Sequence, residues 1–163
     1  NGAGKNGWPL AWFINIYARL LDGEKADRGI KAMITDSSSR NLFNFSLVFQ
    51  IDGNFGVTAG IAECLLQSHI ALHFLPALPT SWKSGSVKGL VARGAREIDL
   101  KWNEGKLTEA VVRPRFTETI EVVGDTLKVI CGDSQVETKK TEIGFSFPAE
   151  GGKTYVLVPA DTN

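Results

Sequence analysis

Leu75-Pro76-Ala77-Leu78-Pro79 divides this chain into two parts that have different sequence patterns. Before this segment, apolar residues recur at intervals of three and four, which is typical of helices. From Ile70 onward the pattern changes, and after Pro79 short alternating or β-branched segments are separated by turn-forming residues. Proline breaks both kinds of regular structure because it has no amide hydrogen. The sequence therefore predicts a helical part, residues 1–78, followed by an antiparallel β-sandwich, residues 79–163.

The first predicted helix begins at Gly7-Trp8 and ends at Gly23. Pro9 fits its first turn, where the missing amide hydrogen breaks no helical hydrogen bond. The apolar residues in this segment are too dense for a helix with a single buried face. They are Trp8, Leu10, Ala11, Trp12, Ile14, Ile16, Tyr17, Leu20 and Leu21. We therefore expect this helix to be buried on more than one side.

Two further helices are predicted before the proline-rich segment, at residues 24–34 and 55–68. In the later one, Gly56 and Gly60 lower the helix propensity and indicate close packing against another backbone. Three helices with this much apolar surface do not close a core alone. We therefore expect them to be part of a larger helical assembly.

Eight short strands are predicted after Pro79. Turn-forming residues such as Gly124-Asp125 and Gly132-Asp133 separate them. The strands are expected at residues 86–92, 95–102, 106–113, 116–123, 126–131, 134–138, 142–147 and 153–158. This spacing is typical of an antiparallel sandwich, and Pro114 should lie at an edge or a bulge.

Composition excludes several classes of protein. The 163 residues are 43% hydrophobic, and 18 basic residues balance 18 acidic ones, with no basic stripe. Nucleic acids and anionic membranes are therefore not expected as partners. No apolar run approaches the roughly 20 residues of a membrane span. The two cysteines, Cys64 and Cys131, lack disulfide or metal-ligand spacing and are expected to be buried apolar residues.

The start of the chain indicates a piece of a longer protein. Residue 1 is Asn, the sequence contains one methionine, Met33, and no charged-then-apolar signal precedes the first helix. We therefore expect a further N-terminal part of the same polypeptide to be the partner of this chain.

One carboxylate stands out in Phe49-Gln50-Ile51-Asp52-Gly53-Asn54-Phe55-Gly56. Asp, Gly and Asn accept the unusual backbone conformations of a sharp turn, so we expect Asp52 on a tight turn before the third helix. A reacting acid or base is often presented in this way. An Asp-Gly-Asn turn that only caps the following helix would have the same sequence, and local chemistry favours that simpler role.

Several blocks around this segment resemble the C-terminal part of family 95 glycoside hydrolases, the α-L-fucosidase family. The resemblance covers about residues 6 to 108. It is carried by Gly7-Trp8, the block from Phe49 to Gly56, Gly60-Ile61-Ala62-Glu63, Leu65-Leu66-Gln67-Ser68-His69, the block from Leu75 to Pro79 with Trp82, Val87-Lys88-Gly89-Leu90 and Ala92-Arg93-Gly94. Ser46-Leu47-Val48 stands where the family usually has a His-Pro-Pro-like stretch.

The resemblance implies a fold and an activity. Residues 1–78 would be the last helices of an (α/α)₆ catalytic barrel, followed by a C-terminal β domain. The activity would be inverting exo-hydrolysis of terminal, 1,2-linked α-L-fucosyl residues from a fucosylated oligosaccharide or glycan, in an extracellular or periplasmic location. Asp52 matches the family's general base, whereas no segment here matches its general acid, a glutamate. The chain alone is therefore expected to be inactive. No metal or organic cofactor is implied.

Two residues are candidate substrate contacts, and each has a simpler structural alternative. Asn54 could bond a sugar hydroxyl, but a turn or capping role is favoured. Trp8 could stack on a sugar face, although its apolar helix favours packing. Two other functions remain open: an α-L-galactosidase of the same family, and a non-catalytic carbohydrate-binding or structural β module.

Overall fold

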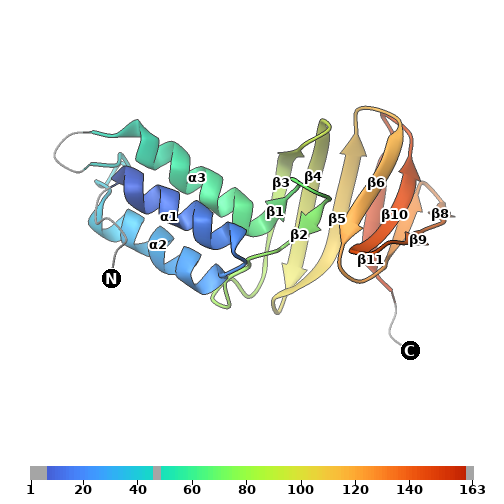
Figure 1. The fold of residues 1–163 in the computed structure, drawn as a ribbon, viewed down its shortest axis with the longest axis horizontal. Helices are drawn as coiled ribbons and strands as arrows, with labels where there is room; N and C mark the ends of the chain where they lie inside the picture. The colour runs from blue at the N-terminus through green and yellow to red at the C-terminus, as the bar shows by residue number, and fades with distance from the viewer. Residues whose placement is uncertain (1–6, 46–48, 161–163) are drawn as a thin grey trace. The chain divides into compact units, whose positions relative to one another are not determined.

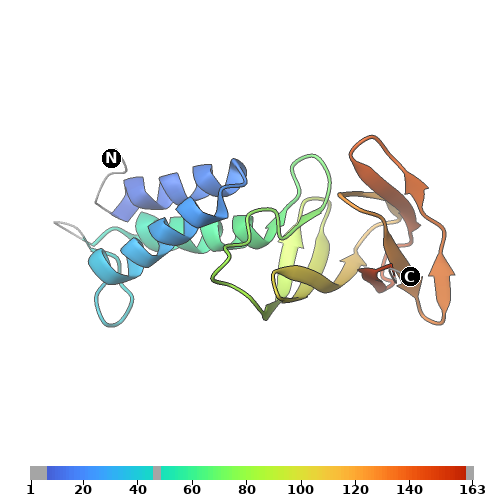
Figure 2. The same cartoon turned by 90° about the horizontal axis from the view of Figure 1, so that it is seen from below.

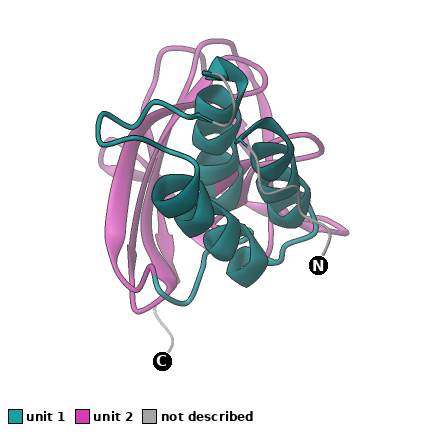
Figure 3. Cartoon of the chain, turned by 90° about the vertical axis from the view of Figure 1, so that its left-hand side faces the viewer, with its two compact units in different colours: residues 1–65, 76–81 teal, residues 66–75, 82–163 magenta. Residues whose placement is uncertain are grey.

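A computed structural model describes residues 7–45 and 49–160. The chain forms two compact units, coloured separately in Figure 3. Unit 1 contains the residues up to Leu65 together with Pro76–Ser81, and unit 2 contains Leu66–Leu75 and the residues from Trp82 onward. The chain therefore crosses between the units three times, at residues 65, 75 and 81. The predicted division at residue 78 remains a prediction for the domains of the complete protein.

Unit 1 consists of three helices: α1 (Gly7–Arg19), α2 (Gly23–Asp36) and α3 (Ile51–Leu65). Figures 1 and 2 show them side by side, with α2 running opposite to α1 and α3. The Asp22 side chain caps α2 by accepting a hydrogen bond from the amide of Lys25. The three predicted helices are thus present.

Glycines bring α1 and α3 into close contact. A Cβ atom at Gly56 would lie 2.7 Å from Cβ of Ala11, and one at Gly60 would lie 2.5 Å from Cγ2 of Ile14. Real Cβ atoms do not approach other atoms so closely, so larger residues would force the helices apart. Ile14 itself is fully buried. The close packing predicted from the glycines of the third helix is therefore observed.

The predicted limits of the third helix are wrong. It begins at Ile51 rather than Phe55 and ends at Leu65, where the short strand β1 (Leu66–Gln67) follows. The expectation of a turn relied on the intrinsic preferences of Asp, Gly and Asn, which tertiary packing overrides here. Asp52 therefore lies in the first turn of α3 rather than on a separate tight turn.

Unit 2 is built from antiparallel sheets, as predicted. A six-stranded sheet has the order β3-β4-β5-β11-β7-β8, and a three-stranded sheet has the order β6-β10-β9. The six strands are β3 (Gly85–Ala92), β4 (Arg96–Asn103), β5 (Lys106–Pro114), β11 (Tyr155–Pro159), β7 (Leu127–Cys131) and β8 (Ser134–Val136). The other three are β6 (Glu118–Val123), β10 (Gly144–Ala149) and β9 (Lys139–Lys140), and a small pair joins β1 to β2 (His73–Phe74).

The core of unit 2 lies between its sheets. Phe147 of β10 contacts Tyr155 of β11 with ring centroids 5.5 Å apart, and Phe145 is fully buried. Buried and less buried residues alternate along β4, β5 and β10, which is the period-two pattern of strands with one face in a core. All eight predicted segments form strands because this alternation and the intervening turns are both visible in the sequence.

None of the helices that the structure describes is long and apolar enough to cross a membrane.

Candidate active site

Asp52 projects from the first turn of α3, and its residue is exposed. Its carboxylate makes no hydrogen bond or ion pair with another residue in the described ranges. The neighbouring amide of Gly53 donates to the carbonyl oxygen of Gln50 at 3.1 Å. The helix start carries the positive end of the helix dipole, which attracts negative charge. Asp52 is thus a carboxylate that is free to contact a molecule outside unit 1.

Asn54 holds the preceding loop against α3 through both ends of its amide. Its Oδ1 accepts a hydrogen bond from the amide of Asn44 at 2.9 Å, and its Nδ2 donates to the carbonyl oxygen of Leu42 at 2.8 Å. The sequence favoured a turn or capping role for Asn54. In the structure its side chain instead fixes the preceding loop to α3.

We expect the Asn54→Ala variant to lower the free energy of unfolding of unit 1 by about 1–3 kcal/mol, because two side-chain hydrogen bonds to the loop backbone are lost. Urea unfolding, monitored through the hydrogen exchange of the α3 amides, measures this change. The matched control is Asn41→Ala, since Asn41 is exposed and bonds only within its own loop. An equal loss in both variants would contradict the role assigned to Asn54.

Asn44 joins the starts of α1 and α3 to the end of α2, and sequence reasoning did not identify it. The residue is 1% exposed, and its Nδ2 donates to the carbonyl oxygen of Ser37 at 2.8 Å and approaches Sδ of Met33 at 3.0 Å. A Cβ at Gly7 would lie 1.8 Å from Asn44 Oδ1, and one at Gly53 would lie 2.6 Å from it. Gly7 and Gly53 therefore make room for this buried amide, a relation that exists only in the folded chain.

Trp8 lies at the start of α1 with 53% of its surface exposed. Its ring stacks on Trp12, with centroids 6.2 Å apart and planes inclined by 10°. Its backbone amide donates a long, 3.4 Å hydrogen bond to Oε1 of Gln50, which places it near the start of α3. Trp8 is thus an exposed aromatic surface beside the segment that carries Asp52.

The other polar residues noted around the helices have structural surroundings. Glu63 forms a two-pronged ion pair with Arg19 of α1, and hydrogen bonding to Glu63 raises the pKa of Arg19. Burial raises the pKa of the Cys64 thiol to about 11, which makes it a weak nucleophile at neutral pH. Burial, with a smaller contribution from His69, lowers the pKa of His73. These groups therefore connect or fill the fold.

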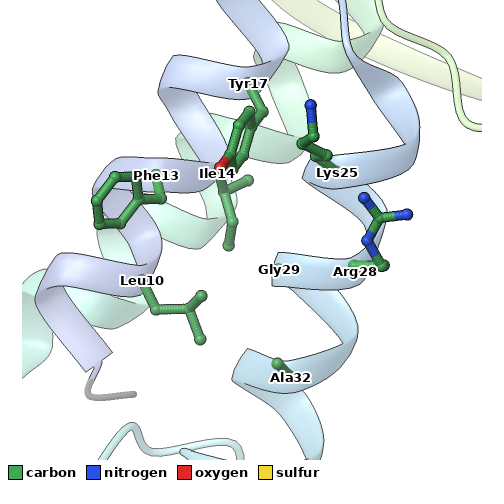
Figure 4. A pocket seen from close by; sticks show the side chains of 8 residues that line it. All are labelled: Leu10, Phe13, Ile14, Tyr17, Lys25, Arg28, Gly29 and Ala32. Carbon is green, nitrogen blue, oxygen red and sulfur yellow. The ribbon is translucent and has the colours of Figure 1, made fainter. Parts of the chain in front are cut away.

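Two cavities lie along α1, and neither is lined by Asp52. The first, between α1 and α2, has a volume of about 410 Å³ and is shown in Figure 4. The second, with a volume of about 300 Å³, is lined by Trp12, Asn15, Ile16, Arg19 and Leu20. Within the described residues, no group of three or more His, Cys, Asp or Glu side chains could hold a metal ion.

Sequence comparison identifies the family of the chain. Residues 67–157 match the C-terminal domain of glycoside hydrolase family 95, and residues 1–65 match the glycosyl hydrolase family 95 catalytic domain. The chain belongs to glycoside hydrolase family 95. Asp52, Asn54 and Trp8 all lie in the part that matches the catalytic domain.

Curated proteins that this family 95 chain resembles are named as fucosidases. "Alpha-L-fucosidase 2" of Arabidopsis thaliana is 39% identical over 116 residues, which are 63% of this chain and 14% of that protein. "Probable alpha-fucosidase A" of Aspergillus oryzae is 28% identical over 135 residues, 72% of this chain and 19% of that protein. The Aspergillus niger protein of the same name is 27% identical over 119 residues, covering 64% and 15%. The chain thus spans 14 to 19% of the length of these relatives.

The family match confirms the resemblance seen in the sequence. The individual roles of Asp52, Asn54 and Trp8 stay predictions. Ser46-Leu47-Val48, where the sequence departs from the family pattern, lies outside the described residues.

Proposed function

We propose that this chain is part of an inverting α-L-fucosidase that removes terminal, 1,2-linked α-L-fucosyl residues from oligosaccharides. The observation that carries this proposal is the exposed carboxylate of Asp52, which has no described partner and lies in the part that matches a glycosidase catalytic domain. The fucosidase names of the relatives support the choice of sugar. The proposed location, extracellular or periplasmic, follows from the family resemblance.

Asp52 would act as the general base in a single displacement. A water molecule held by Asp52 attacks the anomeric carbon, and its proton passes to the carboxylate as the bond to the leaving oxygen breaks. A carboxylic acid on the other side of the bond protonates that oxygen. The two groups of an inverting enzyme lie roughly 6.5–9.5 Å apart, so that the water fits between base and sugar.

The general acid would come from another part of the polypeptide. Family resemblance assigns that role to a glutamate outside this chain. The rest of the sugar pocket would come from the same source. We therefore propose that unit 1 supplies one side of a site that a larger catalytic domain completes.

Exposed apolar side chains support the proposal that unit 1 belongs to a larger catalytic domain. Large apolar residues on the surface are concentrated in unit 1, where they are Trp8, Trp12, Leu20, Leu21, Ile34, Leu42, Phe43, Phe45, Phe49, Ile51 and Phe55. The described part of unit 2 exposes Ile70, Val91, Phe116 and Ile143. Contiguous apolar surface usually marks a site of association. The concentration in unit 1 fits helices that pack against the remaining helices of an (α/α)₆ barrel.

Trp8 and Asn54 would contribute to sugar binding in different ways. The exposed ring of Trp8 offers an apolar face on which a sugar ring can stack. The amide of Asn54 is already bonded to Leu42 and Asn44, so Asn54 would act by holding the loop beside the site.

The test compares the 163-residue chain with the complete polypeptide of its reading frame. We expect the complete polypeptide to release free fucose from an α-1,2-fucosylated oligosaccharide and the chain alone to release none above background, since one catalytic group is missing. Chromatography of the released sugar measures both rates. Turnover by the chain alone would contradict the division of the site. Selective release of L-galactose, or glycan binding without turnover by the complete polypeptide, would contradict the fucosidase proposal.

A further inference from the structure

Asn44 lies at the junction where the first turns of α1 and α3 meet the end of α2. The two helices run in the same direction, with their starts at the same end of unit 1 (Figures 1 and 2). The Asn44 side chain lies between Gly7, the first residue of α1, and Gly53, in the first turn of α3. With 1% of its surface exposed, Asn44 cannot touch a substrate directly. Any effect of Asn44 on catalysis must therefore act through its neighbours.

Asn44 contacts the residues on both sides of Asp52. Its backbone amide donates to Oδ1 of Asn54 at 2.9 Å, and its carbonyl oxygen accepts a long, 3.4 Å hydrogen bond from the amide of Gln50. Its side-chain amide lies against Gly53. The Asp52 carboxylate itself has no described partner. The position of this carboxylate therefore depends on the backbone around it, which Asn44 holds.

The side chain of Asn44 is also fixed to α2. Its Nδ2 donates to the carbonyl oxygen of Ser37, the C-cap residue of α2, at 2.8 Å, and approaches Sδ of the buried Met33 at 3.0 Å. In a close-packed interior, a side chain held in this way cannot turn aside without displacing its neighbours. Asn44 thus fixes the start of α3 relative to the end of α2.

The glycine at position 53 is required by Asn44 rather than by the backbone. Gly53 does not have a positive φ, so its backbone conformation is open to a residue with a side chain. A Cβ there would lie 2.6 Å from both Cγ and Oδ1 of Asn44 and 3.0 Å from its Nδ2. All three atoms belong to the amide group of Asn44. A methyl group at position 53 would therefore push the first turn of α3 away from Asn44 and move Asp52 with it.

Stability alone does not account for an asparagine at this position. Its Oδ1 is buried and has no hydrogen-bond partner among the described residues, which is unfavourable. The carbonyl oxygen of Ser37 also accepts a hydrogen bond from the amide of Phe45 at 2.9 Å, so it does not depend on Asn44. An apolar side chain would avoid the unsatisfied oxygen. The contact between Asn44 and the start of α3 therefore indicates a role beyond stability.

We propose that Asn44 is a positioning residue for the general base: its buried amide, held by α2, sets the place of Gly53 and thereby that of the Asp52 carboxylate. This role deepens the proposed function and rests on it, because it takes Asp52 as the base. A base acts only within hydrogen-bond reach of the attacking water, and a misplacement of about 1 Å can cost about 10²-fold in rate. A small shift of the first turn of α3 should therefore lower kcat and leave KM nearly unchanged.

Four variants of the complete polypeptide test this role: Gly53→Ala, Asn44→Ala, the double variant Asn44→Ala/Gly53→Ala, and Gly60→Ala as the matched control. Gly60 is also in α3, and a Cβ there would lie 2.5 Å from Cγ2 of the buried Ile14. It follows Asp52 by eight residues, about 12 Å along the helix axis. The measurements are kcat and KM for an α-1,2-fucosylated oligosaccharide, corrected for the folded fraction, and Tm.

We expect Gly53→Ala to lower kcat at least about tenfold with KM within about threefold, because the base is displaced. Gly60→Ala should leave kcat within about threefold, even where it lowers Tm as much. Asn44→Ala alone should lower kcat about tenfold, since the start of α3 loses its support. In the Asn44→Ala background the colliding amide is gone, so adding Gly53→Ala should change kcat by less than about threefold.

Asp52→Asn, measured beside these variants, separates the two proposals. If Asp52→Asn loses its rate but Gly53→Ala and Gly60→Ala have equal kcat, the positioning role alone is overturned. An equal effect of Gly53→Ala with and without the Asn44 amide would also overturn it. A normal rate for Asp52→Asn would contradict the general base and the positioning role together. If Gly53→Ala does not fold, Asn44→Ala decides, since an unchanged kcat in that folded variant would overturn the role.

Discussion

The Asp52→Asn variant of the complete polypeptide is expected to lose about 10²–10⁴-fold in kcat/KM for an α-1,2-fucosylated oligosaccharide, the usual contribution of a general base. The amide has nearly the same shape as the carboxylate but cannot accept a proton from the attacking water. Since Asp52 is exposed and has no described partner, the replacement removes no contact from unit 1. The Tm should therefore change little. Initial rates and thermal unfolding of the same preparations measure both quantities.

Asp125→Asn is the matched control for this experiment. Asp125 is also exposed and has no described ion pair, but it lies in a turn of unit 2, far along the sequence from the catalytic part. Its replacement makes the same change of charge and should leave kcat/KM within about twofold of the original value. A normal rate for Asp52→Asn would show that the carboxylate has only a structural role at the helix start. A large fall in Tm for that variant would lead to the same conclusion.

The strands of unit 2 could be predicted because the information for them is local. Each of the eight predicted segments overlaps an observed strand, with differences of a few residues at the ends. Alternation of apolar and polar residues fixes which face is buried, and a turn residue ends each segment. The strand order could not be predicted in the same way. The insertion of β11 between β5 and β7 depends on pairing between segments that are distant in the sequence.

The start of α3 shows where local information fails. Asp52, Gly53 and Asn54 favour a turn when considered alone, but in the fold Gly53 packs against the buried Asn44 and Asn54 bonds to the preceding loop. These contacts support a helix that starts at Ile51. Propensities differ by less than about 1 kcal/mol per residue, so a few tertiary contacts can reverse them.

The candidate site was predictable in part. Asp52 could be identified from its sequence block, because the block itself carries the family resemblance. Asn44 could not be identified, because its importance depends on two glycines, Gly7 and Gly53, that flank it only in the folded chain. The cavity between α1 and α2 was also hidden, since the small size of Gly29 matters only where Ile14 of α1 packs against it.

Phe145→Ala is expected to lower the free energy of unfolding of unit 2 by about 3–5 kcal/mol, the usual cost of truncating a buried phenylalanine to alanine. Phe145 is fully buried in β10, which pairs with β6 on one side and with β9 on the other. Its loss would leave a cavity between rigid strands that cannot collapse into it. A loss of this size is a large part of the roughly 5–15 kcal/mol that stabilises a typical domain.

Hydrogen exchange during urea titration of the 163-residue chain measures this effect in unit 2 separately from unit 1. Amides of β6 and β10 report the stability of the core of unit 2, and amides of α1 report unit 1. Phe116→Ala is the control, because Phe116 is 58% exposed and its truncation should change stability by less than about 1 kcal/mol. Because the substitution lies outside unit 1, α1 protection should be nearly unchanged in both variants. An equal and small change for Phe145→Ala and Phe116→Ala would show that the core of unit 2 does not depend on this ring.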